Sequence, residues 1–235
     1  MTHKINHTKQ VRYEFMRGRE AVAAIKACPV GYLPIGCLER HGDHLPMGLD
    51  VIKAYGVCCL VAQVAGGVVF PPHHYGGIHR MTEEQLDRVT GQWGNIYTDR
   101  TATDHLIDIL EQLARAGIRV LVLYTGHYPA CQVDMLREIA HHFARGTTLR
   151  VIPFAENMIL DGDHAGASET SFMLYLDKSL VNMTAIQQVN YQDHGWGGPK
   201  DPMNASVALG EESVHRVISH LKAEIEKALA KQPDK

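Results

Sequence analysis

Short apolar runs and longer amphipathic stretches alternate along most of the chain. The short runs are typical of buried strands, and they predict strands at 30–35, 68–70, 118–123 and 148–153. The longer stretches carry apolar residues at helical spacing and predict helices at 19–27, 51–64, 98–116, 130–143, 164–176 and 210–231. Residues 81–97 show a less regular pattern, and the Gly/Pro-rich segment 195–202 predicts a loop.

The order of these elements predicts the fold class. Strand and helix alternate, which is characteristic of an α/β protein whose strands are mostly parallel. The run 118–123 is almost continuously apolar, as expected of a central strand that helices cover on both faces. We therefore expect a three-layer α/β/α fold with a mostly parallel sheet. Because no internal repeat or linker is visible, we expect a single domain over residues 1–235.

Polar clusters rich in histidine directly follow three of the predicted strands. They lie at 39–50, at 73–79 and at His127. In an open α/β sheet the carboxyl ends of the strands share one edge, and ligands bind there. The three clusters therefore predict one functional site that is built from several loops.

The segment 39–50 carries the residue types of a metal site. Glu39 and His41 are two residues apart, so their side chains leave an extended backbone on the same side. Glycine and proline residues after them allow the chain to double back and bring Asp50 to the same point. This carboxylate–imidazole–carboxylate set suits Zn²⁺, Mn²⁺ or Fe²⁺. The alternative at this stage is a polar loop whose charges face water.

Composition narrows the class of function. The chain has 235 residues, a net charge of −3 and 15 histidines, more than its 9 tyrosines. The charge gives no basic surface, so nucleic acid and membranes are not expected as partners, whereas histidines in polar loops favour metal or proton chemistry. The 5 cysteines include no Cys-x-x-Cys pair, which predicts thiols in a reducing compartment. With no apolar leader or membrane-spanning run, we expect a cytoplasmic protein.

Four motifs occur in order between about residues 30 and 185. They are Leu33–Pro46 with Asp50, then Tyr75-Gly76, then Gly126-His127-Tyr128, and His164-Ala165-Gly166 followed by Glu169-Thr170-Ser171. In order and spacing they resemble the creatininase family of creatinine amidohydrolase-like proteins. The resemblance implies a creatininase-like α/β fold, a binuclear metal centre, a small-molecule substrate and, commonly, a homohexamer.

The same resemblance implies roles for individual residues. Glu39 and His127 match ligands of one divalent ion, His41 matches a ligand of the other, and Asp50 would bridge the two. Two such ions, whether Zn²⁺, Mn²⁺ or Fe²⁺, need a shared carboxylate to offset their mutual repulsion. We therefore expect two divalent ions per chain.

Two further residues are implicated by the last motif. His164 matches a histidine that moves a proton near the scissile bond, and a neutral imidazole suits general acid–base catalysis. Glu169, at the start of a predicted helix, is expected either as a metal ligand or as the group that orients His164. Both residues are therefore catalytic candidates.

The sequence departs from the family pattern around the substrate. Creatinine-opening members carry an acidic ligand two residues after the histidine of the Gly-His-Tyr segment, and here that position is Pro129. Either Glu169 replaces this ligand or the second metal is held more weakly. The tryptophans that surround the substrate in those enzymes are also absent. The metal frame is thus kept, and creatininase activity itself is not expected.

Four residues are candidates for contact with a substrate. They follow predicted strands or lie in the irregular segment, and they are His74, Tyr75, Trp93 and Tyr128. Loop histidines are also common without any such role, and for Trp93 a packing or subunit-interface role is an equal alternative.

Three functions remain open from the sequence. The first is a metal-dependent hydrolase that cleaves a C–N bond of a small, polar, cyclic amide, in which metal-bound hydroxide attacks the carbonyl and His164 protonates the leaving group. The second is a hydrolase that opens the ring of a cyclic keto-polyol beside its ketone, an interpretation favoured by Gln92 and Asn95. The third is a non-catalytic oligomeric binding protein, against which the retained ligands argue.

Overall fold

The computed structural model describes residues 10–188 and 200–231, so most of the predicted loop at 195–202 lies outside the described residues. The strands are β1 (Val30–Ile35), β2 (Val68–Val69), β3 (Val120–Thr125) and β4 (Arg150–Ala155). The helices are α1 (Gly18–Ala27), α2 (Leu49–Ala65), α3 (Glu83–Trp93), α4 (Ala102–Arg115), α5 (Ala130–Ala144), α6 (Ala167–Asp177) and α8 (Val207–Ala230). Short 3₁₀ turns occur at Tyr13–Phe15, Glu156–Met158, Lys178–Leu180, Met183–Gln188 and Pro202–Asn204.

The four strands form one parallel sheet. Their order is β2-β1-β3-β4, so the two central strands are β1 and β3. These two pair over their whole length, from Val30 opposite Val120 to Ile35 opposite Thr125. Every residue of both strands is buried, which explains why they are apolar without alternation. The predicted parallel sheet is confirmed.

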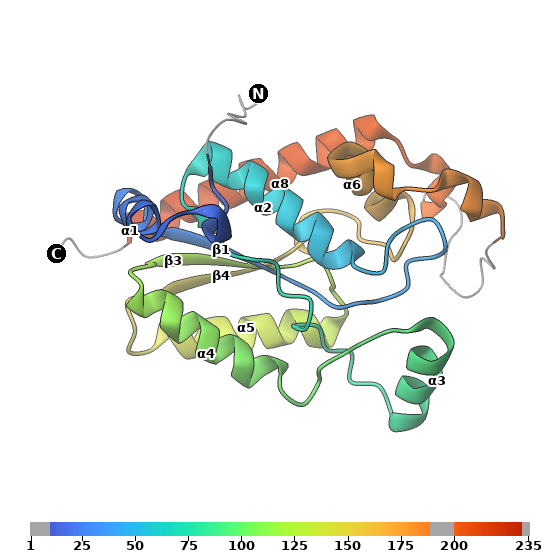
Figure 1. Ribbon diagram of the computed structural model, residues 1–235, viewed down its shortest axis with the longest axis horizontal. Coiled ribbons are helices and arrows are strands. Elements are labelled where there is room, and N and C mark those ends of the chain that lie inside the picture. Colours follow the sequence, from blue (N-terminus) through green and yellow to red (C-terminus); the bar gives the residue numbers. More distant parts are fainter. Residues whose placement is uncertain (1–9, 189–199, 232–235) are drawn as a thin grey trace.

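Helices cover both faces of the sheet and make the predicted three layers (Figure 1). Helices α2 and α8 pack over one face, and α4 and α5 lie over the other. Each face has its own apolar core, because the side chains of a buried strand point alternately to the two sides. Among the described residues, no helix is both long enough and apolar enough to cross a membrane.

Helix α3 is an element that the pattern of residues 81–97 did not reveal. It begins with a capping box, in which Thr82 and Gln85 exchange side-chain and backbone hydrogen bonds, and ends at Gly94 with a left-handed φ of 73°. None of its residues is buried, and it stands apart from the layers in Figure 1. Because α3 contributes nothing to the core, apolar periodicity is a weak guide to it; its caps are the better signal.

Candidate metal centre

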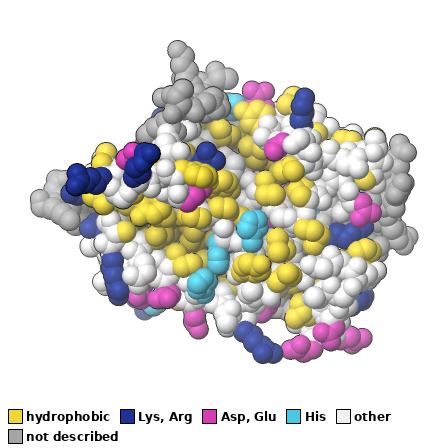
Figure 2. Space-filling model, viewed as in Figure 1, with side chains coloured by type: hydrophobic (Ala, Val, Ile, Leu, Met, Phe, Trp, Pro, Cys, Tyr) yellow, Lys and Arg dark blue, Asp and Glu magenta, His cyan; other side chains and the backbone are white. Residues whose placement is uncertain are grey.

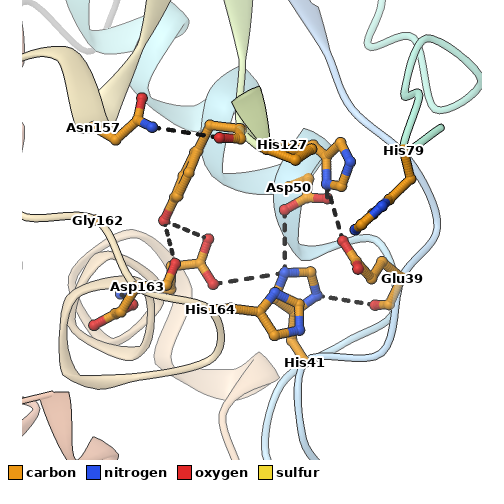
Figure 3. Close-up of a pocket in the computed structure, with 13 residues that line it drawn as sticks. Glu39, His41, Asp50, His79, His127, Asn157, Gly162, Asp163 and His164 are labelled. Atoms are coloured by element: carbon orange, nitrogen blue, oxygen red, sulfur yellow. Dashed lines mark hydrogen bonds and ion pairs between the residues drawn. The ribbon is translucent and has the colours of Figure 1, made fainter. Parts of the chain in front are cut away.

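The predicted ligands converge at the carboxyl edge of the sheet, as Figure 3 shows. Glu39 and His41 follow β1, and His127 follows β3, so the pairing of these central strands brings their ends together. Asp50 lies in the first turn of α2, which begins at Leu49 rather than at the predicted Val51. Glu169 lies in the first turn of α6. Both carboxylates therefore sit where a helix dipole favours negative charge.

Two glycines allow Asp50 to sit between the strand ends. A Cβ atom on Gly126 would clash with the backbone carbonyl of Asp50, and one on Gly36 would lie 2.7 Å from the Asp50 Cβ. Each glycine directly follows a strand, Gly36 after β1 and Gly126 after β3. The start of α2 can approach the sheet this closely only because both positions lack a side chain.

The first group of ligand atoms surrounds one oxygen of Asp50. His127 Nδ1 lies 2.9 Å from Glu39 Oε2 and 3.5 Å from Asp50 Oδ2. The other ring nitrogen of His127, Nε2, lies 3.1 Å from the carbonyl oxygen of Ile78. A carbonyl only accepts hydrogen bonds, so Nε2 carries the proton and Nδ1 is left as the ligand nitrogen.

The second group surrounds the other oxygen of Asp50. His41 Nε2 lies 3.2 Å from Asp50 Oδ1 and 3.6 Å from Glu169 Oε2. His41 Nδ1 lies 2.9 Å from the backbone carbonyl of Glu39, which fixes its tautomer in the same way. The three atoms of this group lie close enough together to hold a metal ion, and the same is true of the first group with Cys37.

One oxygen of each candidate glutamate ligand is held by a hydrogen bond from another side chain. Tyr97 donates a 2.8 Å hydrogen bond to Glu39 Oε1, and Lys53 donates a 2.7 Å hydrogen bond to Glu169 Oε1. The Tyr128 hydroxyl lies 3.0 Å from Glu169 Oε1, but its shorter contact, 2.6 Å, is with the carbonyl oxygen of Asp163. In both cases the second oxygen, Oε2, turns toward a histidine of the centre. Tyr97 and Lys53 thus decide which oxygen of each glutamate is available to a cation.

The charges of the centre are strongly coupled. Burial alone would lower the pKa of His41, but the carboxylates of Asp50 and Glu169 outweigh it and raise that pKa to about 10. Burial alone would raise the pKa of Asp50, but His41 and His127 lower it to about 2. Asp50 Oδ1 is buried and accepts no hydrogen bond within the described structure, although His41 is near. A dry cluster of carboxylates and imidazoles of this kind suits a divalent cation.

A buried lysine lies behind the second group. Lys53 is fully buried, and its ammonium lies 2.7 Å from Glu169 Oε1 and 3.3 Å from Glu156 Oε2. Burial raises the pKa of Glu156 to about 7, and Tyr124 donates a 2.7 Å hydrogen bond to its other oxygen. Sequence reasoning missed this lysine. The available signal is that Lys53 is the single charged residue in the largely apolar stretch 51–64, and a fully buried lysine needs partners.

The ligands line an open cavity of about 440 Å³, and His164 lines it as well. The ring centroids of His164 and His41 are 4.4 Å apart, and His164 Nε2 lies 3.1 Å from the carbonyl oxygen of Arg40. Burial, followed by the nearby His41, lowers the pKa of His164, so this imidazole is neutral at pH 7. The next residue, Ala165, has a left-handed φ of 56° and donates its N–H to Glu169 Oε2 at 2.7 Å. The His164 loop is thereby tied to the second ligand group.

The structure brings together most, but not all, of the sequence-predicted site residues. Tyr128 lines the cavity with the five ligands and His164, whereas Trp93 lines a neighbouring cavity. His74 and Tyr75 lie outside the lining of both, so their contact with substrate stays a prediction. Residues that sequence reasoning did not single out, or left as core or ordinary loop residues, also surround the centre, and they are Cys37, His79, Tyr97, Asn157 and Asp163.

Comparison with known proteins shows the family of this chain. Residues 14–225 match the family model Creatininase, described as creatinine amidohydrolase. A creatinine amidohydrolase from Pseudomonas putida is 30% identical over 188 residues, which cover 71% of each chain. A crystal structure of creatinine amidohydrolase (creatininase) superposes with a TM-score of 0.71 at 25% identity, covering 97% of this chain and all of that one.

A mutant creatininase described as of the Zn–Zn type superposes with a TM-score of 0.72 at 24% identity, over 96% of this chain and all of that one. At 24% identity this similarity is evidence for the fold alone, and the superposition over 96% of this chain confirms the predicted α/β fold. The family match spans nearly all of the described residues, including both ligand groups. The chain therefore belongs to the creatininase family of metal-dependent amidohydrolases.

Proposed function

We propose that this protein hydrolyses the C–N bond of a small, polar, cyclic amide at a binuclear metal centre. The observation that carries the proposal is the arrangement of Asp50, whose two oxygens face two different ligand groups. Glu39 and His127 would hold one divalent ion and His41 and Glu169 the other, with Asp50 shared between them. Descriptions of solved creatininases name Zn and Mn, and the mixed nitrogen and oxygen ligands suit either ion.

Glu169 supports the second half of this centre. Pro129 has no side-chain donor, and it lines the cavity at the position where creatinine-opening members carry an acid. Glu169 Oε2 lies 3.6 Å from His41 Nε2 and belongs to the ligand group of His41 and Asp50. We infer that this carboxylate takes the place of the lost ligand.

The bound ions would polarise the substrate carbonyl and lower the pKa of water near it. The residues of the chain would orient the ligands and transfer the proton. The fixed tautomers of His41 and His127 keep one nitrogen of each directed into the centre. His164 is neutral and has Nε2 against the Arg40 carbonyl, so proton uptake and delivery to the leaving nitrogen are assigned to Nδ1.

The experiment is a hydrolysis assay on a substrate panel. Metal-loaded protein is incubated with neutral and charged cyclic amides, and ring opening is followed by proton NMR. The proposal predicts turnover of at least one amide and none with the Asp50→Asn variant. The panel also contains cyclic keto-polyols, because the cavity is lined mainly by polar side chains that would suit a hydroxyl-rich ring. If these rings were opened and no amide were hydrolysed, the proposed C–N bond would be wrong, and the substrate would be a cyclic keto-polyol opened beside its ketone.

Two wider features are proposed with this function. We infer that residues 1–235 form one domain and that the chain assembles into a homohexamer, as the family resemblance implies. Light scattering coupled to size-exclusion chromatography tests the assembly, and a monomeric mass would contradict it.

A further inference from the structure

A second cavity of about 270 Å³ adjoins the candidate metal centre. Glu39 and His164 line both cavities, so the two lie side by side. The other polar and aromatic side chains that line the second cavity are Arg40, which lies between Glu39 and His41 in the sequence, and five residues of the segment 81–97. Those five are Arg88, Gln92, Trp93, Asn95 and Tyr97. Hydrolysis at the metals does not by itself assign a ligand to this second cavity.

The chain builds this cavity from two directions. Four residues of α3 line the cavity, at positions 88, 89, 92 and 93. Positions 88 and 92 are one helical turn apart, as are 89 and 93, so all four lie on one face of the helix. After Gly94 the chain returns along the exit of β1, where Ile96 forms an antiparallel bridge with Leu38. That return places Asn95 within 2.9 Å of the Arg40 backbone N–H, and Tyr97 against Glu39.

Two arginines give this cavity its charge. The Arg40 guanidinium lies 3.9 Å above the Trp93 ring and 2.9 Å from Asp43. Arg88 is exposed, and its side chain makes no hydrogen bond or ion pair with any described residue. Glu39 is the one carboxylate in the lining, and Tyr97 and His127 engage its oxygens. Asp43, which lies outside the lining, accepts hydrogen bonds from Nε and Nη2 of Arg40, so Arg88 is the lining charge that no described acid balances.

The acidic residues of α3 lie away from this lining. Its first turn contains Glu83 and Glu84, neither of which lines the cavity. Figure 2 shows acidic side chains gathered at the lower right, where α3 lies in Figure 1. The helix thus separates its charges, with acids on the outside and Arg88 toward the cavity.

We propose that this second cavity binds an oxyanion, a carboxylate or phosphate group carried by the substrate. Arginine presents several N–H donors in a planar fork that matches such groups, and Arg88 would supply them here. Arg40, whose guanidinium stacks on Trp93 and donates to Asp43, adds positive charge beside it. The proposal rests on the proposed function, because the scissile amide of the same molecule must lie at the metal centre. The substrate class then becomes a small cyclic amide with an anionic substituent.

The test compares two ligands that differ in one group. Binding of hydantoin-5-acetate and of its neutral amide, hydantoin-5-acetamide, is measured by isothermal titration calorimetry on zinc-loaded, full-length protein. Charge-assisted hydrogen bonds predict at least a tenfold tighter dissociation constant for the anion. Arg88→Gln and Arg40→Gln should each reduce that preference several-fold. Arg100→Gln is the matched control, because Arg100 pairs with Glu83 on the outside of α3.

Each outcome decides the proposal. A preference that is lost in the arginine variants and kept in Arg100→Gln supports it. Equal affinities, no binding of either ligand, or a preference that survives in both variants overturns it, the last because the metals alone would then explain the anion binding. Metal content and turnover of neutral amides test the proposed function separately, so the two failures are distinguishable.

Discussion

Each proposed ligand side chain of the candidate metal centre has a second contact that fixes it. Backbone carbonyls hold the proton-bearing nitrogens of His41 and His127, Tyr97 holds one oxygen of Glu39, and Lys53 holds one oxygen of Glu169. Such outer contacts orient ligands and set their protonation, so the ligand set is arranged before any ion arrives. Asp50 is held at one oxygen by the Cys37 thiol, which donates to Oδ2 at 3.3 Å, whereas its Oδ1 accepts no hydrogen bond from the described residues.

At the residue scale, His164→Ala separates proton transfer from metal binding. The Nε2 atom of His164 lies against the Arg40 carbonyl, whereas His41 and His127 face the two oxygens of Asp50. The variant should therefore keep the wild-type metal content while turnover falls roughly a hundred- to ten-thousand-fold. The control is His142→Ala, which removes an exposed histidine late in α5. Wild-type rates in His164→Ala would remove this residue from the mechanism.

Lys53→Met tests the buried cation. The variant leaves Glu169 and Glu156 buried without their ammonium partner, which should cost roughly 3–5 kcal/mol of unfolding free energy. Denaturant unfolding measures the loss, and the double variant Lys53→Met/Glu156→Gln should recover part of it. Lys222→Met, which breaks an ion pair that is partly exposed, is the control and should cost less than about 1 kcal/mol. Equal effects at the two lysines would refute the role given to Lys53.

At the scale of elements, the sequence predicts what hydrophobic patterning controls. The strands β1 and β3 and the helices α2 and α5 follow from apolar runs and helical spacing, because burial dictates those positions. Helix α3 does not, because none of its residues is buried and its caps are the clearest signal that defines it. The boundaries of β3 and β4 shift by two residues from those predicted, since apolar runs do not mark where hydrogen bonding ends.

The site follows the same division. Glu39, His41, Asp50 and His127 could be predicted because they follow strands or open a helix, where topology brings them together. Lys53 and Tyr97 could not, because their roles depend on side chains that are distant in sequence. Asp163 accepts hydrogen bonds from the backbone N–H groups of Ser168 and Glu169 at the start of α6, a local role that many aspartates have and that does not mark a site.

Gly126→Ala tests the junction between β3 and α2. A methyl group there would collide with the Asp50 backbone, so we expect a loss of about 1–3 kcal/mol in stability and weaker metal binding. The matched control is Gly91→Ala in α3, where the added Cβ meets nothing within 4 Å and should stabilise the helix by about 0.5–1 kcal/mol. Thermal unfolding and zinc titration of both variants check this, and unchanged zinc affinity in Gly126→Ala would contradict the role given to this junction.

At the scale of the whole molecule, the centre makes stability depend on pH when metal is absent. The pKa of His41 is raised from 6.5 in the unfolded chain to about 10 in the fold. The stability that its protonated form contributes is therefore fully present below pH 6.5 and is lost as the pH rises through 10. We expect the melting temperature of chelator-treated protein to fall over this window, and the His41→Gln variant to lack that fall. A flat profile for metal-free wild type would contradict the coupling.

The measurement that tests the central claim most directly is the number of metal ions per chain. Elemental analysis is made on protein purified without chelator, reloaded with Zn²⁺ or Mn²⁺ and freed of excess ion. A binuclear centre predicts two ions per chain in the wild type, one in Glu169→Gln and fewer than one in Asp50→Ala, because Asp50 serves both groups. One ion in the wild type, with no change in Glu169→Gln, would contradict a binuclear centre completed by Glu169.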